Sequence, residues 1–214
     1  KVACNGAEPV RPATLERFAE FFGPSGFRRE AFMPAYGLAE VGLIVSATPA
    51  DKAPESVAGE AKESGSSGGV LGEFELQIVD PNSGHPVAEG EVGEVWLRGE
   101  SVARGYWEKP AINEEIFGAH LATGEGPFLR TGDLGAVVAG ELGITGRLKE
   151  LIIIRGVNHY PQDIEITAEG VHEGIRPGCG AAFSVQVGDD EELVLVQEVN
   201  PDAVEDLEGL IDQI

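Results

Sequence analysis

The first clear pattern in the chain is a set of apolar residues with the spacing of an α-helix. It comprises Leu15, Phe18, Ala19 and Phe22. Residues three or four apart share one face of a helix, so the pattern predicts an amphipathic helix with one buried side. Gly23-Pro24 ends the pattern, because neither residue suits the interior of a helix.

Short apolar runs before and after this helix predict buried strands. Residues 2–5 run into Gly6, and residues 31–34 run into Tyr36-Gly37. An apolar run that stops at a glycine fits a buried strand that turns sharply into a loop. Residues 41–45 fit either a short helix or a strand.

Three pairs of apolar or alternating segments are separated by turn residues, and they predict antiparallel strands. The pairs are 75–80 with 92–97, 137–138 with 142–144, and 181–187 with 193–199. A further apolar strand is expected at 151–154. Pro161 suits the first turn of a helix that turns Ile164 inward, and a last amphipathic helix is expected from about Ala203.

The segment 48–72 interrupts these patterns. It is rich in proline, serine, glycine, glutamate and lysine, and residues 63–69 read Glu-Ser-Gly-Ser-Ser-Gly-Gly. This composition is typical of a flexible linker or a mobile surface loop, which is what we expect here.

Composition places the chain among ordinary folded proteins. Of its 214 residues, 42% are hydrophobic and 24% are charged, which is enough to build a real core. The 15 basic and 37 acidic residues give a net charge of -22, which opposes the phosphates of nucleic acids and anionic lipid surfaces. We therefore expect no nucleic-acid partner, and we attribute the acidity to solubility.

Cys4 and Cys179 lie far apart, with no Cys-X-X-Cys or Cys/His spacing. A disulfide framework and a zinc site are therefore not indicated, and both side chains are expected to be buried. There is neither a signal peptide nor an apolar run of about 20 residues, so we expect a cytoplasmic protein without a membrane span. Because the chain opens on Lys1 within a strand pattern, we expect a piece of a larger protein.

Several short strings occur in a fixed order along the chain. They are Asn5-Gly6-Ala7-Glu8-Pro9, Tyr36-Gly37-Leu38-Ala39-Glu40, Gly93-Glu94-Val95-Trp96 followed by Gly105-Tyr106-Trp107, Thr131-Gly132-Asp133, and Gly146-Arg147-Leu148-Lys149-Glu150. Together they resemble the adenylate-forming superfamily of acyl-CoA synthetases, peptide-synthetase adenylation domains and luciferases. Residues 158–165, Asn-His-Tyr-Pro-Gln-Asp-Ile-Glu, resemble its fatty acyl-AMP ligase branch. The resemblance covers residues 5–199 apart from 48–72.

The resemblance implies a fold of the mixed α/β (α+β) class, namely a fragment of the adenylate-forming ligase fold with distorted antiparallel strands. Residues 1–148 would be the C-terminal part of the large AMP-binding domain, and residues 149–214 the truncated beginning of the mobile C-terminal domain. Lys149 falls where the superfamily has its hinge residue. The phosphate-gripping Ser/Thr/Gly loop of the superfamily would lie upstream of this chain and its catalytic lysine downstream. Segment 48–72 occupies the place of a branch-specific insertion, and it is short and poor in apolar residues.

Two of these strings suit the adenine end of a nucleotide site. Residues 6–8 offer a backbone edge with few side-chain atoms where a flat base can approach, and Tyr36 offers an aromatic face for stacking. The alternative is a turn at a strand end beside a packed tyrosine. By resemblance both segments line the adenine pocket, and the implied set is Gly6, Ala7, Glu8, Tyr36, Gly37, Leu38 and Ala39.

Three charged residues complete the candidate site. Glu40 could hold Mg²⁺, because a single carboxylate together with phosphate oxygens suits that cation, whereas the alternative is a solvated surface group. Asp133 can accept hydrogen bonds from the two vicinal hydroxyls of a ribose, and Arg147 could add donors to the same sugar. The alternative for this pair is an ordinary surface contact. Ala39 stands where most of the superfamily has a threonine whose hydroxyl meets the α-phosphate.

The resemblance implies an enzyme that uses ATP and Mg²⁺ to activate a fatty acid as an acyl adenylate. The acyl group would then pass to an acyl carrier protein of a polyketide or peptide synthase. A fatty acyl-CoA synthetase and a catalytically silent adenylate-binding or interaction domain are the alternatives. Glu40 and the hinge Lys149 are the catalytic candidates, the fragment alone is expected to be inactive, and His159 and His172 are expected to be structural.

Overall fold

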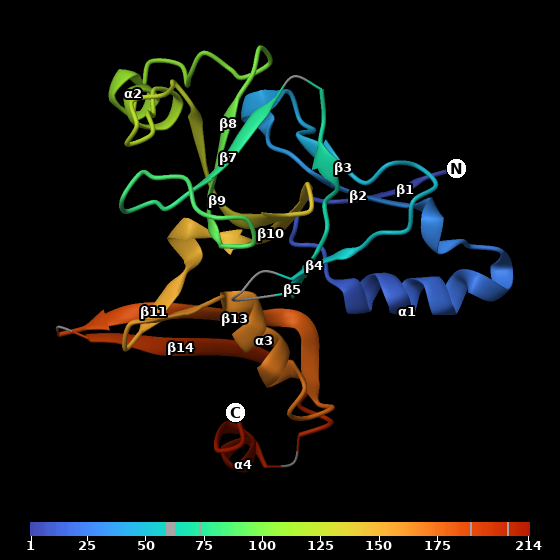
Figure 1. Cartoon of the computed structure of the whole chain (residues 1–214). Helices are drawn as coiled ribbons and strands as arrows, with labels where there is room; N and C mark the ends of the chain where they lie inside the picture. The colour runs from blue at the N-terminus through green and yellow to red at the C-terminus, as the bar shows by residue number, and fades with distance from the viewer. Residues whose placement is uncertain (59–62, 73, 189, 205) are drawn as a thin grey trace. The chain divides into compact units, whose positions relative to one another are not determined.

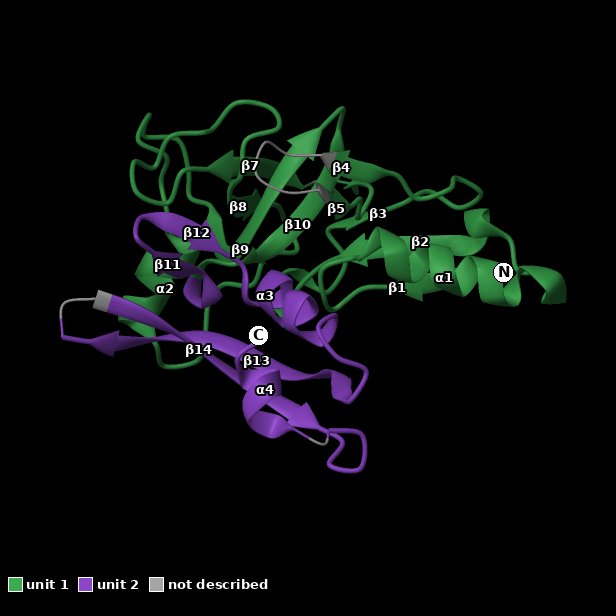
Figure 2. Cartoon of the chain, turned by 90° about the horizontal axis from the view of Figure 1, so that it is seen from below, with its two compact units in different colours: residues 1–148 green, residues 149–214 purple. Residues whose placement is uncertain are grey.

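The chain forms a mixture of helices and short strands in two units (Figures 1 and 2). The computed structural model describes residues 1–58, 63–72, 74–188, 190–204 and 206–214. The first unit comprises Lys1–Leu148 and the second Lys149–Ile214. The interpretation of these units as part of a large AMP-binding domain and the beginning of a mobile domain stays a prediction.

A four-stranded sheet opens the first unit. Its strands lie in the order β1 (Ala3–Asn5), β2 (Phe32–Tyr36), β3 (Ser46–Ala47) and β6 (Gly69–Val70). β1 and β2 are parallel, and the chain between them forms α1 (Pro12–Phe22) and two short 3-10 turns, η1 (Gly23–Ser25) and η2 (Arg29–Ala31). Leu15 of α1 and Phe32 of β2 belong to one cluster of buried apolar residues. The helix and the strand expected from the apolar spacing are confirmed.

The expectation that both cysteines are buried is wrong. β1 is an edge strand of the first sheet and is only half-buried, so Cys4 on it is exposed. Cys179 is also exposed, and it lies where the pairing of β13 (Ile175–Val187) with β14 (Asp190–Val199) shifts register. Burial at these positions depends on what covers the strand, which the small size of cysteine does not determine.

The second sheet of the first unit is antiparallel. Its order is β10 (Glu141–Arg147), β9 (Leu129–Val138), β8 (Gly93–Arg98) and β7 (Glu75–Val79). The β9–β10 hairpin turns at Ala139 and Gly140, whose φ angles of +50° and +80° suit the tight turn expected there. The pairing of β9 with β10 shifts register between Ile144 and Gly146, so these antiparallel strands are distorted, as the resemblance implied. The core beside this sheet comprises Val41, Val45, Ile78, Val95, Leu97, Leu129, Leu142 and Ile144.

Much of the segment 48–72 forms strands that are tied to the rest of the first unit. β4 (Ser56–Ala58) pairs with β5 (Glu63–Gly65), and β6 joins the first sheet. Ser67 is buried, and its amide donates to the carbonyl of Leu142 in β10 at 2.7 Å. The expectation of a flexible linker or mobile loop is therefore wrong for the part of this segment that the structure describes.

Small residues explain why a linker-like composition forms paired strands here. A Cβ on Gly68 would lie 1.9 Å from the carbonyl carbon of Ala47, so only glycine allows the two backbones to approach this closely. Composition measures the absence of large apolar side chains, and it does not detect pairing between backbones. Residues 59–62 of the same segment lie outside the described residues.

One helix has no counterpart in the sequence analysis. α2 (Pro110–Phe117) is short, and it packs beside β9. Its apolar residues Ile116 and Phe117 face the core of the second sheet, whereas Ile112 is exposed. Two inward residues are too few to produce a recognisable helical period.

The second unit contains two antiparallel strand pairs and two helices. Its elements after η4 (Leu148–Glu150), which lies at the boundary, are β11 (Ile152–Ile154), β12 (Val157–His159), α3 (Pro161–Glu169), β13, β14 and α4 (Leu207–Ile211). β11 pairs with β12, β13 pairs with β14, and α3 packs on β13. α4 begins at Leu207 rather than near Ala203, because Asp206 caps it by accepting from the amide of Gly209 at 3.0 Å.

None of the helices in the described part of the chain has the length and hydropathy needed to cross a membrane.

Candidate nucleotide-binding site

Asp133 lies between a tyrosine and an arginine from two other strands. Asp133 belongs to β9, Tyr36 ends β2 and Arg147 ends β10. The hydroxyl of Tyr36 donates to Oδ2 of Asp133 at 2.7 Å, and Nε of Arg147 donates to Oδ1 at 3.1 Å. Arg147 is paired directly with Asp133 in the β9–β10 ladder. The structure therefore brings three of the sequence candidates together.

The hydroxyl of Tyr36 stays protonated and therefore remains a hydrogen-bond donor to Asp133. Burial raises the pKa of Tyr36 far above its ordinary value, and the charge of Asp133 and the hydrogen bond to it act in the same direction. The phenol therefore keeps its proton across the physiological range. Asp133, which is 7% exposed, is held in one orientation by this donor and by Arg147.

A buried glutamate supports the turn before Asp133. Glu94 of β8 is 1% exposed. Its carboxylate accepts from Nε1 of Trp96 at 2.9 Å, from Nη2 of Arg130 at 2.8 Å and from the amide of Gly132 at 3.1 Å. A buried carboxylate is tolerated only with such partners, and here one of them is the turn itself. Glu94 belongs to a string that carries the resemblance, and an acidic residue inside an apolar strand is a signal that could have indicated this supporting role.

Thr131 fixes the same turn from its other side. Its hydroxyl donates to the carbonyl of Val95 at 2.7 Å and accepts from the amide of Asp133 at 3.0 Å. Gly132 between them has a φ of +72°, a conformation that glycine adopts without strain. The string Thr131-Gly132-Asp133 is therefore a tight turn that presents one carboxylate.

The backbone edge expected at residues 6–8 lies beside the end of β2. A Cβ on Gly6 would fall 2.8 Å from the carbonyl oxygen of Ala35, so glycine permits the approach. Ala7 has a φ of +75°, and residues 7 and 8 are exposed. Because β1 and β2 are parallel, the ends of both strands meet at one edge of the sheet, which is also where Tyr36 lies.

The loop after β2 folds back tightly on itself. A Cβ on Gly37 would lie 1.4 Å from the carbonyl oxygen of Leu43, so this position accepts glycine alone. Leu38 is half-buried and packs against the core of the second sheet. A 3-10 turn, η3 (Ala39–Val41), follows, in which Ala39 is exposed, Glu40 is half-buried and Val41 is buried. The role of these residues in binding an adenine base stays a prediction.

Glu40 lies in this 3-10 turn, and it has two partners that the sequence analysis did not foresee. The hydroxyl of Tyr106 donates to Oε1 of Glu40 at 2.7 Å, and the amide of Ala103 donates to the carbonyl oxygen of Glu40 at 2.7 Å. The hydrogen bond to Glu40, followed by burial and by the glutamate charge, raises the pKa of Tyr106 to about 12. Tyr106 belongs to the string Gly105-Tyr106-Trp107, which carries the resemblance. Its contact with Glu40 spans 66 residues, so the local sequence did not indicate it.

The fit of Mg²⁺ to Glu40 rests on the number of available ligands. Within the described ranges, no group of three or more His, Cys, Asp or Glu side chains could hold a metal ion. Mg²⁺ is commonly bound by one or two carboxylates together with water and substrate phosphates, so it does not require such a group. Oε1 of Glu40 takes the phenol of Tyr106, and Oε2 takes no hydrogen bond from any described residue. A lone carboxylate of this kind fits a magnesium ion that arrives with a nucleotide.

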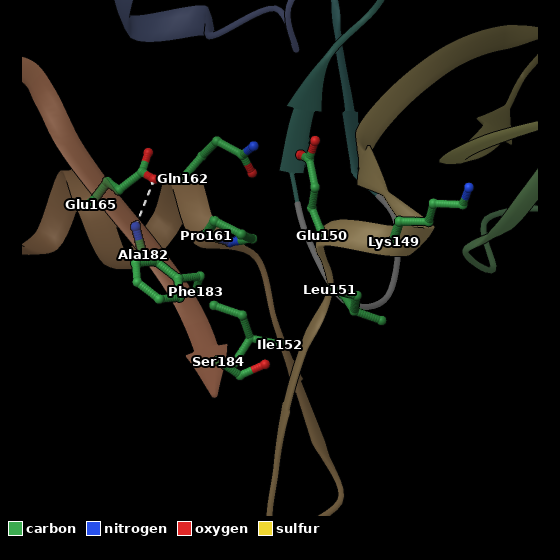
Figure 3. Close-up of a pocket in the computed structure, with 10 residues that line it drawn as sticks. All are labelled: Lys149, Glu150, Leu151, Ile152, Pro161, Gln162, Glu165, Ala182, Phe183 and Ser184. Carbon is green, nitrogen blue, oxygen red and sulfur yellow. Dashed lines mark hydrogen bonds between the residues drawn. The ribbon is translucent and has the colours of Figure 1, made fainter. Parts of the chain in front are cut away.

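The second unit has a pocket of about 350 Å³ lined by residues of η4, β11, α3 and β13 (Figure 3). In one wall the carboxylate of Glu165 accepts from the amide of Ala182 at 3.0 Å. Oε1 of Gln162 is buried and has no hydrogen-bond partner among the residues that the structure describes. Lys149 lies at the margin, and its side chain extends away from Phe183 in Figure 3. The hinge role of Lys149 stays a prediction.

The fold and this site define the class of the protein. A solved fatty acyl-adenylate ligase from L. pneumophila, in complex with acyl adenylate and pyrophosphate, is similar with a TM-score of 0.67 and 36% identity, over 99% of this chain and 40% of that chain. The McyG A-PCP structure, complexed with phenylalanyl-adenylate, is similar with a TM-score of 0.74 and 27% identity, over 99% of this chain and 36% of that chain. The chain therefore has the fold of a fragment of an adenylate-forming ligase, as expected.

The model of the AMP-binding enzyme family matches residues 1–107, and the chain belongs to this family. The medium-chain-fatty-acid acyl-carrier-protein ligase JamA of Moorena producens is 45% identical over 93% of this chain and 37% of its own length. The long-chain-fatty-acid AMP ligase FadD32 of Mycolicibacterium smegmatis is 40% identical over 86% of this chain and 34% of its own length. The resemblance to the fatty acyl-AMP ligases is confirmed, and the chain spans little more than a third of these relatives.

Proposed function

We propose that the protein containing this chain is a cytoplasmic enzyme that activates a fatty acid with ATP and transfers the acyl group to an acyl carrier protein. The observation that carries the proposal is that Asp133 is fixed between Tyr36, which ends β2, and Arg147, which ends β10. The similarity to JamA supports the substrate class and the carrier, because both are part of the name of that relative.

Asp133 is assigned to the ribose. Each carboxylate oxygen has two lone pairs, and one on each oxygen is used by Tyr36 and Arg147. Each oxygen can therefore still accept one hydroxyl, which matches the two vicinal hydroxyls of a ribose. Because the carboxylate is already oriented before the nucleotide arrives, little further ordering is needed on binding.

The adenine is assigned to the edge formed by residues 6–8 and 36–39. Residues 6 and 37 are exposed, so a flat base can approach the backbone there, and Tyr36 supplies an aromatic ring. Ala39 supplies no hydroxyl for the α-phosphate, so contacts to that phosphate must come from elsewhere.

In the reaction, a carboxylate oxygen of the fatty acid bonds to the α-phosphorus of ATP, and the bond from that phosphorus to the bridging oxygen breaks with release of pyrophosphate. Glu40 would hold a magnesium ion, which supplies positive charge beside the phosphates when it is bound. The protein's own contribution is to orient the sugar through Asp133 and to present the carboxylate of Glu40 toward the phosphates.

A fatty acyl-CoA synthetase is the second candidate, and segment 48–72 favours it. The described part of this segment is tied to β10 by polar contacts: Nζ of Lys52 donates to Oε1 of Glu141 at 2.9 Å, and the hydroxyl of Ser66 donates to Oε2. An insertion that blocks the use of CoA is expected to act through apolar contact, and this segment offers few apolar side chains.

A product assay separates the candidates. The full-length protein is given a fatty acid, ATP, Mg²⁺, an acyl carrier protein and CoA together, and acyl adenylate, acylated carrier and acyl-CoA are resolved. Acyl adenylate and acylated carrier as the main products support the proposal, whereas acyl-CoA as the main product makes the protein a synthetase. Nucleotide binding without pyrophosphate exchange would instead identify a catalytically silent domain.

Lys149 is assigned as the hinge between the adenylation and transfer steps. Replacing Lys149 with proline fixes φ and stiffens the pivot, so the two half-reactions should lose different amounts of rate. Pyrophosphate exchange measures the first half-reaction and carrier loading measures the second. If both keep the wild-type rate, the pivot lies elsewhere.

A further inference from the structure

The loop before α2, which contains Ala103 and Tyr106, forms two hydrogen bonds with Glu40. The amide of Ala103 donates to the main-chain carbonyl of Glu40, and the hydroxyl of Tyr106 donates to the side-chain oxygen Oε1, each at 2.7 Å. The first contact fixes the backbone at position 40, and the second fixes the end of the side chain. Such a pair of contacts restricts the rotamers of a glutamate that is only half-buried.

Tyr106 is itself fixed by α2. The side chain of Asn113 accepts from the amide of Tyr106 at 2.7 Å and donates to its carbonyl at 2.9 Å, so both peptide groups of the tyrosine are engaged. The ring of Tyr106 packs edge to face on Phe117, with 5.1 Å between the ring centroids. Gly105 has a φ of +138°, and a Cβ there would lie 2.5 Å from the amide carbon of Asn113. The loop therefore needs glycine at 105 and asparagine at 113 to deliver the phenol.

We propose that Tyr106 is a positioning residue for Glu40: its hydroxyl holds one carboxylate oxygen so that Oε2 is presented to the magnesium ion of a bound nucleotide. The inference rests on the proposed role of Glu40. A carboxylate that binds a metal is generally oriented by a hydrogen bond to its other oxygen, and loss of such a partner typically weakens metal binding about tenfold or more. α2 then has a function, since it carries the two residues that fix Tyr106.

The neighbouring Trp107 provides a matched control. It is 87% exposed, whereas Tyr106 is 39% exposed and bonded to Glu40. A Trp107→Phe change alters an aromatic residue in the same loop and leaves the Tyr106 hydroxyl in place. A Tyr106→Phe change removes that hydroxyl and keeps the ring that packs on Phe117.

The test is the binding of Mn²⁺ to the full-length protein in the presence of α,β-methylene ATP, with free Mn²⁺ measured by electron paramagnetic resonance. Tyr106→Phe is expected to raise the Kd for Mn²⁺ about tenfold, and Trp107→Phe should leave it unchanged. Asn113→Ala, which loosens the loop but keeps the hydroxyl, should give a smaller weakening. Wild-type or tighter binding by Tyr106→Phe would overturn the inference, because the phenol would then be neutral or would compete with the cation.

A Glu40→Gln variant separates this inference from the proposed function. If Glu40→Gln weakens Mn²⁺ binding and Tyr106→Phe does not, the inference fails and the role of Glu40 stands. If Glu40→Gln binds Mn²⁺ like the wild type, the role of Glu40 fails and the inference fails with it. In the Glu40→Gln background, Tyr106→Phe should add nothing; an undiminished further loss would show that Tyr106 acts on the fold instead and would overturn the inference.

Discussion

Asp133 and Glu40 are the two carboxylates of the candidate site, and the protein supports them in different ways. Asp133 is 7% exposed and takes hydrogen bonds from residues at the ends of two other strands. Glu40 is half-buried in a short turn, and within the described part of the chain its side chain takes one hydrogen bond, from Tyr106. Tyr36, one of the two partners of Asp133, packs against the core of the second sheet, whereas the partner of the Glu40 side chain lies on a loop in front of a short helix.

The difference separates a rigid recognition group from an adjustable one. Groups whose partners lie in the core open only when the core opens, whereas groups held by exposed loops move at a lower free-energy cost. In the proposed function, Asp133 meets a sugar that is the same in ATP and in an adenylate, so this partner can be rigid. The charge near the phosphates would change when pyrophosphate leaves, so the limited freedom of Glu40 suits its proposed role at that end.

The largest effect should come from the buried support of Asp133. Removing one member of a buried ion pair costs roughly 3–5 kcal/mol, and because Arg130 is 28% exposed we expect the lower end for Glu94→Gln, about 3 kcal/mol of unfolding free energy. Urea unfolding measures this change. Tyr106→Phe, the corresponding change beside Glu40, should cost less than about 1 kcal/mol. If Glu94→Gln and Tyr106→Phe lowered the unfolding free energy by the same amount, the residues that support Asp133 and Glu40 would not differ in rigidity.

The second-largest effect is expected for Asp133→Ala, which should lower activity while the protein remains folded. Unmade hydrogen bonds to a charged group are worth about 1.5–3 kcal/mol, so kcat/KM for ATP in pyrophosphate exchange should fall roughly ten- to hundredfold. Asp51→Ala is the control, because Asp51 pairs with Arg28 at 3.5 Å on the surface and its side chain is 85% exposed. Exchange within twofold of wild type for Asp133→Ala would contradict the ribose assignment.

Tyr36→Phe should have a smaller effect in the same direction. It removes the neutral donor to Asp133 and leaves Arg147 in place. A hydrogen bond to a charged group contributes about 1.5–3 kcal/mol, but Arg147 still orients the carboxylate, so only part of this should be lost from binding and AMP affinity measured by calorimetry should fall about fivefold. Unchanged affinity would show that Arg147 alone orients the carboxylate.

The smallest effect concerns the titration of the Tyr106 phenol. The pKa of Tyr106 is raised from 10.0 to about 12, with the hydrogen bond to Glu40 as the main cause, so its proton is retained below pH 10.0 and the contact is lost as the pH rises through about 12. Glu40→Gln should lower this pKa toward 10.0. The ultraviolet absorbance of tyrosinate, taken as a difference from Tyr106→Phe, measures it. An unchanged titration curve would mean that burial, and not Glu40, sets the pKa.

Several elements could be predicted because their signals are local. The spacing of apolar residues in α1 and the tight turn at Ala139 and Gly140 each depend on neighbours in sequence. The same is true of the β13–β14 pair. α2 was missed because only two of its residues face the core, which is too few to set a period.

The two wrong expectations share one physical cause. Whether Cys4 is buried depends on whether another strand covers β1, and none does in the described sheet. Whether segment 48–72 is a loop depends on backbone pairing with distant residues, such as that of Ser67 with Leu142. The composition of a segment gives its residue types but does not indicate which distant residues pack against it or pair with its backbone.

By itself the sequence determined the family of this protein, the order of its short strings and the residue types of its candidate nucleotide site, because each of these properties depends only on which residues occur and in what order. The tertiary structure alone decided that Tyr36 reaches Asp133 across 97 residues and that Tyr106 reaches Glu40 across 66. Such contacts depend on strand register and on how loops fold back, and a shift of one residue in a strand turns every side chain to the opposite face.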